Sequence, residues 1–94
     1  MDHRPSVELL ESTHRFPGTY QIRAIGRSED DFAGRVLAAV LDELAAPGDL
    51  DHSIRTTSGG RHTAVTLDIA VQTASQVRAI YAAIQPLEGL VLLL

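Results

Sequence analysis

Apolar and polar residues alternate in three stretches of the chain, as they do in strands with one buried face. The first covers residues 16–26, and two more, residues 50–58 and 61–71, flank a Gly-Gly pair. A Gly-Gly pair between alternating runs indicates a hairpin, because the favoured hairpin turns need positive φ angles. A wholly apolar run, residues 90–94, predicts a short fourth strand at the end of the sequence.

Two other stretches carry apolar residues at helical spacing. The first predicts a helix over about residues 29–46, with Ser28 as its N-cap and Pro47 at its end. The second predicts a helix that begins after Thr73 and ends at Pro86. The order of elements is therefore strand, helix, strand, strand, helix, strand.

This order predicts an α+β fold of the ferredoxin-like βαββαβ type. With right-handed crossovers, the two halves assemble as a four-stranded antiparallel sheet, order 4-1-3-2, with both helices on one face. We expect residues 14–94 to form this single domain. Residues 1–13 could form only one helical turn, so we expect a loosely ordered N-terminal arm.

The hairpin register follows if Ser58 lies opposite Arg61 across the two-residue turn. One face then carries apolar pairs, and the other places Asp51 directly opposite Asp68. Because like charges that face each other destabilise a sheet, we expect either fraying at this pair or an arginine from the neighbouring strand close to it. Arg23 is the candidate for that arginine.

Composition narrows the functional classes. The 94 residues contain no cysteine, which excludes disulfides, a thiolate nucleophile and cysteine metal sites. All eight basic residues are arginine, and the net charge is −4. A negative net charge disfavours a domain that binds nucleic acid through the electrostatic attraction of the whole molecule. The apolar runs are too short to span a membrane, so we expect a soluble, cytoplasmic protein that binds neither nucleic acid nor membrane.

Candidate catalytic and metal-binding residues are scarce. The four histidines lack the spacing that would bring two imidazoles to one metal, and no nucleophile elbow is present. His52 points toward the core at the sheet margin, where we expect a hydrogen-bonded ring. We therefore expect no catalytic residue, no metal and no cofactor. The exposed positions of the central strands lack the aromatics on which RNA bases stack, since they are Gln21, Arg23, Ala64, Thr66 and Asp68.

The loop after the first strand contains Gly26, Arg27, Ser28 and Asp30. It resembles the ligand-binding loop of ACT regulatory domains, which bind amino acids at dimer interfaces. The resemblance implies a small-molecule effector held by backbone N–H groups at the helix start. The alternative interpretation is helix capping, which accounts for the same residues.

A second resemblance covers residues 16–94. The chain is similar to the YbeD-like family of small bacterial proteins of unknown function, which implies a ferredoxin-like fold without established catalytic residues. Two departures are His62, where this family often has tyrosine, and the absence of lysine. The motifs that carry the resemblance are Phe16-Pro17, Tyr20, Ile25-Gly26, Phe32, Val36, Val40, Ser58-x-Gly60 and Gln76-Val77-x-x-Ile80-Tyr81.

The last predicted strand is apolar on both faces, although only one face can contact the helices. An exposed apolar edge needs a cover, so we expect a homodimer or docking to a protein partner. The lead hypothesis is a non-catalytic regulatory or interaction module that self-associates, and the alternative is an ACT-like amino-acid sensor. The candidate interface comprises Arg23, Ile25, Asp68, Leu90, Val91, Leu92, Leu93 and Leu94.

Overall fold

The computed structural model describes residues 3–94 and contains one four-stranded antiparallel sheet in the order β2-β3-β1-β4. This order is the predicted one, and the ferredoxin-like α+β fold is confirmed. The elements, in chain order, are α1 (Val7–Thr13), β1 (Gly18–Arg27), α2 (Phe32–Leu41), the 3-10 turn η1 (Pro47–Asp49), β2 (Leu50–Thr56), β3 (His62–Val71), α3 (Ala74–Ile84) and β4 (Leu90–Leu93).

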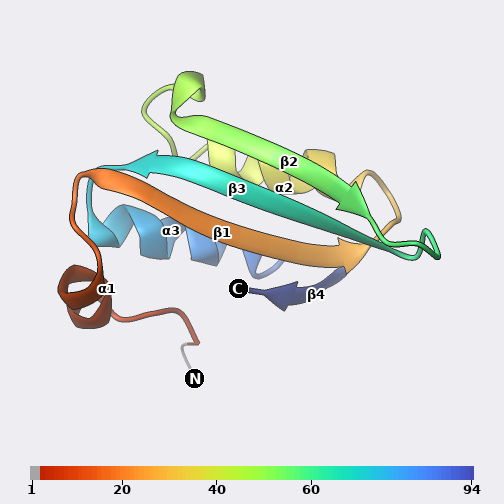
Figure 1. Cartoon of the computed structure of the whole chain (residues 1–94), viewed down its shortest axis with the longest axis horizontal. Helices are drawn as coiled ribbons and strands as arrows, with labels where there is room; N and C mark the ends of the chain where they lie inside the picture. Colours follow the sequence, from red (N-terminus) through yellow and green to blue (C-terminus); the bar gives the residue numbers. More distant parts are fainter. Residues whose placement is uncertain (1–2) are drawn as a thin grey trace.

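The sheet has one covered and one uncovered face. Helices α2 and α3 lie together behind the sheet in Figure 1, so the face turned to the viewer carries no helix. Successive side chains in β1 and β3 point to opposite faces of the sheet, so every second side chain lies in the layer between the sheet and the helices. The core of this layer includes Ile22, Ala24, Val36, Val40, Val65, Leu67, Ile69, Val77, Ile80 and Ile84.

The hairpin register agrees with the prediction. Leu50 lies opposite Ile69, Asp51 lies opposite Asp68, and the backbone N–H of Thr57 donates to the His62 carbonyl at 2.9 Å. His52 lies opposite the buried Leu67, as predicted, but its side chain is exposed. Leu50 at the start of β2 packs against the core, but farther along this edge strand the helix side is open to solvent, and even Ile54 is 50% exposed.

Helix α2 is shorter than the sequence predicted. It begins at Phe32, and its N-cap is Asp31 rather than Ser28. Asp30 and Asp31 have φ angles of 52° and 51°, and this left-handed backbone prevents the helix from starting at residue 29. Beyond Leu41 the hydrogen bonds tighten to i→i−3, as in the bond from the Leu44 N–H to the Leu41 carbonyl, so the helix does not reach residue 46.

The N-terminal segment also differs from the expected loose arm. Met1 and Asp2 lie outside the described residues. Helix α1 is capped by Ser6, whose hydroxyl accepts a hydrogen bond from the Leu9 N–H at 3.1 Å. Leu10 is only 1% exposed and belongs to the core. The Arg78 guanidinium on α3 donates to the Pro5 carbonyl at 2.9 Å. Tertiary packing therefore holds a helix that is too short to be stable alone.

Candidate functional site

Strand pairing arranges the outward side chains in rows that run across the uncovered face. The acidic row lies toward the end of the sheet at which β1 begins, because it contains Gln21, the fourth residue of that strand. We call the face formed by these residues the open face. From that end, the rows are Asp51, Asp68 and Gln21; then Ser53, Thr66, Arg23 and Leu94; then Arg55, Ala64, Ile25 and Leu92.

Strand β4 divides its apolar side chains between the two faces. Leu92 lies opposite Ile25, and Leu94 continues the ladder through two backbone hydrogen bonds to Arg23 at 3.1 and 2.9 Å. Both leucines therefore belong to the open face, where Leu92 is 45% and Leu94 is 57% exposed. The remaining candidates differ: Leu90 and Leu93 pack against the core, and Val91 is exposed next to the irregular pairing between Ile25 and Gly26.

The centre of the open face is hollowed between two arginines. A depression of about 410 Å³ lies between Arg23 on β1 and Arg55 on β2, and small residues such as Ala64 and Thr66 line it. Both arginines are exposed, and within residues 3–94 neither guanidinium takes part in an ion pair or a side-chain hydrogen bond. The hollow can therefore receive an anionic group from outside the chain.

The two acids of the next row lack a cation in the described part of the chain. Asp68 accepts a hydrogen bond from the Gln21 Nε2 at 3.0 Å, and Asp51 Oδ1 accepts one from the backbone N–H of His52 at 2.9 Å. Arg23, the arginine expected close to this pair, lies one row away, opposite Thr66, and forms no ion pair with either acid within residues 3–94; the residue opposite Asp68 on β1 is Gln21. The pair also does not fray, so two carboxylates stand side by side at this end of the face.

The loop between β1 and α2, where the sequence placed candidate ligand-binding residues, is bonded to its neighbours. The Ser28 hydroxyl lies 2.7 Å from the Thr63 hydroxyl on β3, and the Ser28 N–H donates to the Arg61 carbonyl at 2.9 Å. The Arg27 N–H donates to the Gly89 carbonyl at 2.9 Å. Gly26 packs against the Phe32 ring, so the candidate residues are adjacent but largely engaged within the chain.

Sequence reasoning missed Arg35, which organises this loop. Its guanidinium donates to the carbonyls of Asp30 at 2.8 Å, Glu88 at 2.9 Å and Glu29 at 3.3 Å. These bonds join the loop before α2 to the turn before β4. A cavity of about 40 Å³ lies beside Arg35 and Arg27, which is room for about one water molecule or a small functional group.

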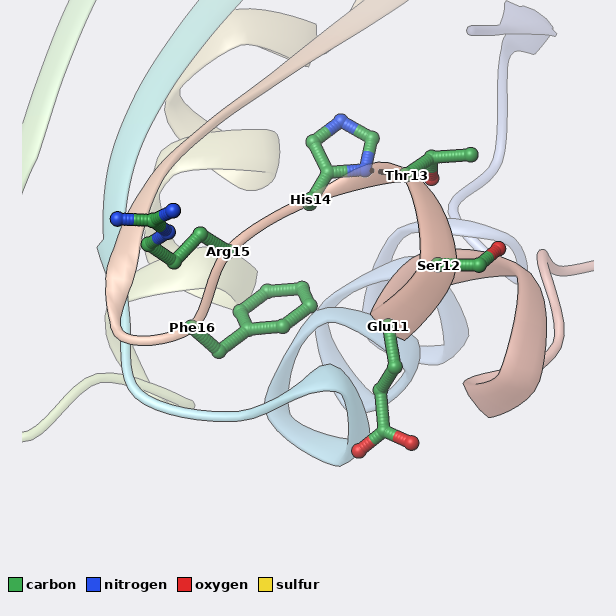
Figure 2. Close-up of a pocket in the computed structure, with 6 residues that line it drawn as sticks. All are labelled: Glu11, Ser12, Thr13, His14, Arg15 and Phe16. Carbon is green, nitrogen blue, oxygen red and sulfur yellow. Dashed lines mark hydrogen bonds between the residues drawn. The ribbon is translucent and has the colours of Figure 1, made fainter.

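A separate hollow of about 490 Å³ lies at the junction of α1 and β1. Figure 2 shows that its polar side chains do not converge, since the Glu11 carboxylate and the Ser12 hydroxyl point away from the His14 ring. The His14 Nδ1 lies 2.9 Å from the Thr13 hydroxyl, and its ring packs against Tyr20 with the centroids 4.7 Å apart. Although the residue types resemble those of a hydrolase, the hydroxyls of Thr13 and Ser12 both donate to the Leu9 carbonyl, at 2.7 and 2.9 Å, so His14 does not take a proton from either as nucleophilic catalysis requires.

Two tyrosines form the buried polar contact of the core. The hydroxyls of Tyr20 and Tyr81 lie 3.2 Å apart. Burial raises the pKa of Tyr81 well above its usual value, and the hydrogen bond to Tyr20 raises it further. Tyr81 therefore stays neutral at physiological pH and serves as a hydrogen-bonding core residue.

Metal ligands and membrane-spanning helices were also sought over residues 3–94. Within that range, no three histidine, aspartate or glutamate side chains are grouped so that they could hold a metal ion. The helices of the same range are too short or too polar to cross a bilayer. Of the surfaces described, the open face combines exposed apolar side chains, unpaired charges and a hollow.

Comparison with known proteins agrees with the resemblance found in the sequence. A UPF0250 protein from Shewanella piezotolerans is 32% identical over 82 residues, which cover 87% of this chain and 86% of the relative, and one from Shewanella woodyi is 30% identical over the same shares. The solution structure of protein HP0495 from H. pylori matches this structure with a TM-score of 0.68 at 18% sequence identity. The match covers the whole of this chain and 98% of HP0495, so the two proteins share a fold. The family described as "Protein of unknown function (DUF493)" matches residues 11–94, and the chain belongs to this family.

Proposed function

We propose that this protein is a non-catalytic interaction module of the bacterial cytoplasm that self-associates through its open face. The observation that carries the proposal is the pair of exposed leucines, Leu92 and Leu94, on the same uncovered surface as Ile25. Large apolar side chains that cluster on one face favour a protein interface. A regulatory role follows if a partner or effector changes this association.

The open face supports association better than the free edge of β4 does. That strand has four residues, and its pairing with β1 is interrupted between Ile25 and Gly26. Short edges with irregular pairing resist addition of a further strand. The side chains of Leu92 and Leu94, by contrast, project from the sheet where a second layer can cover them.

Sedimentation velocity of the full chain tests this proposal. We expect a reversible dimer, and we expect Leu92→Arg to raise its dissociation constant by about tenfold or more, which corresponds to about 1.4 kcal/mol. Leu9→Arg is the matched control, because Leu9 is exposed on α1, away from the open face. A wild-type chain that stays monomeric at high concentration, or a Leu9→Arg effect as large as that of Leu92→Arg, would contradict the proposal.

Amino-acid sensing at the β1–α2 loop is the second candidate. It is favoured by the small cavity beside Arg27 and Asp30, where Arg27 pairs with Glu29 at 3.5 Å, since one charged end group of an amino acid fits there while the rest of the ligand lies outside. A ligand that binds the native state at about 100 times its dissociation constant stabilises it by about 2.7 kcal/mol. A thermal-shift panel of the amino acids should then single out one ligand, whereas unchanged melting temperatures across the panel would remove this candidate.

A further inference from the structure

The open face carries two sets of charges that have no opposite partner within residues 3–94. At one end, Asp51 and Asp68 stand side by side without a cation. One and two rows away, Arg23 and Arg55 flank the hollow without an anion. Adjacent like charges destabilise a sheet, so a binding partner that neutralises both sets at once would gain affinity from each.

The chain cannot bring Asp51 and Arg55 together itself. They lie four residues apart on β2 and point to the same face, which separates them by about 13 Å along the strand at about 3.3 Å per residue. A surface that opposes this strand in the reverse direction, however, would place an arginine over the acid and an acid over the arginine. A second copy of the chain offers such a surface.

One two-fold orientation meets this requirement. Consider a two-fold axis that lies between the two open faces and runs perpendicular to the strands. Each strand of the second copy then lies over its own equivalent in the first, and the order of the rows is reversed. Asp51 of each copy then faces Arg55 of the other. The middle row meets its own equivalent, so that Leu94 packs on Leu94 at the β4 edge and Arg23 lies over Arg23. Rotation about an axis parallel to the strands instead places Leu92 and Leu94 over the polar residues of β2.

We infer that the open face binds a second copy of this chain in the first orientation, with Asp51 of each copy paired with Arg55 of the other. This inference rests on the proposed self-association and adds its orientation and its ion pairs. Two sheets stacked in this way lie about 10 Å apart, a layer that the leucines and arginines can fill. The hollow of about 410 Å³, which Arg55 lines, receives the Asp51 carboxylate of the other copy.

Charge reversal and its rescue test the pairing by sedimentation velocity on the full chain. Asp51→Arg and Arg55→Asp should each raise the dissociation constant by about tenfold or more, because each creates like-charged pairs across the two-fold axis. The double variant restores opposite charges and should return the dissociation constant close to the wild-type value. Asp42→Arg is the control for net charge, since Asp42 is exposed at the end of α2 on the helix side of the sheet.

The outcomes separate this inference from the proposal on which it rests. A wild-type dimer that both single reversals leave unchanged would overturn the ion pairs while self-association stands, and so would two weakened singles without rescue in the double variant. A monomeric wild type would overturn both. A monomer whose melting temperature rises with inorganic phosphate, but not in Arg55→Asp, would assign the hollow to a small anion instead of a second copy.

Discussion

Replacing Leu10 with alanine should lower the free energy of unfolding by about 2–5 kcal/mol, the range for large-to-small changes in a packed core. Leu10 is 1% exposed and packs in the core from a seven-residue helix. The substitution leaves a cavity and also removes the apolar anchor of α1, so the whole N-terminal segment should loosen. Urea denaturation followed by circular dichroism measures this loss.

The preceding residue supplies the matched control. Leu9 lies on the same helix but is 54% exposed, so Leu9→Ala should change the free energy of unfolding by at most about 0.5 kcal/mol. Equal stability of the two variants would mean that α1 does not dock on α3. The loose arm predicted from the sequence would then describe residues 3–13 better than the structure does.

Gly26→Ala should destabilise the fold by about 1–3 kcal/mol, as expected for a methyl group forced into a filled core. A Cβ at Gly26 would overlap the Cε1 and Cζ atoms of Phe32, and that ring is buried. The ring must therefore move, or the end of β1 must shift, before the methyl group fits. The same shift would disturb the β1–α2 loop that Arg35 holds.

Gly48→Ala is the control for this substitution, because a Cβ at Gly48 would meet no atom within 4 Å. Its unfolding midpoint should stay near that of the wild type, since the new methyl group meets open space. If Gly26→Ala unfolds at the same urea concentration as Gly48→Ala, the close packing of Phe32 on β1 is contradicted.

The sequence pattern was sufficient for the topology and the hairpin register. Alternation on both sides of Gly59-Gly60 placed Asp51 opposite Asp68, and the structure has this pair. The reason is that side chains alternate with a strict period of two, so a slip by one residue would expose the whole apolar face of β3. Such a register is fixed by local composition and needs no tertiary information.

Features that depend on tertiary packing were not predictable in this way. Acidic residues before Phe32 are typical of a first helical turn, but Asp30 and Asp31 adopt left-handed backbone and the helix begins later. The alternation of apolar and polar residues placed His52 on the helix side of β2, but it could not tell that His52 and Ile54 stay exposed on this edge strand. For α1, the burial of Leu10 depends on α3, which lies far away in the sequence.

The candidate site was predictable in part. The apolar run at residues 90–94 marked all five residues as interface candidates. It could not tell that Leu90 and Leu93 pack against the core while Leu92 and Leu94 lie on the open face, because the irregular pairing of β4 decides this division. Arg55 was missed as a partner for the acids because its relation to Asp51 appears only when two copies are considered. Arg35 was missed because it contacts the Glu88 carbonyl, 53 residues away, and no local pattern marks such a residue.

Nuclear magnetic resonance of the uniformly labelled full chain tests the central claim most directly. Amide spectra recorded over a dilution series report which residues change environment on association. The account predicts concentration-dependent shifts at Arg23, Ile25, Leu92 and Leu94, with none at Leu9. Spectra that do not change with concentration, or shifts confined to α1 and α2, would contradict self-association through the open face.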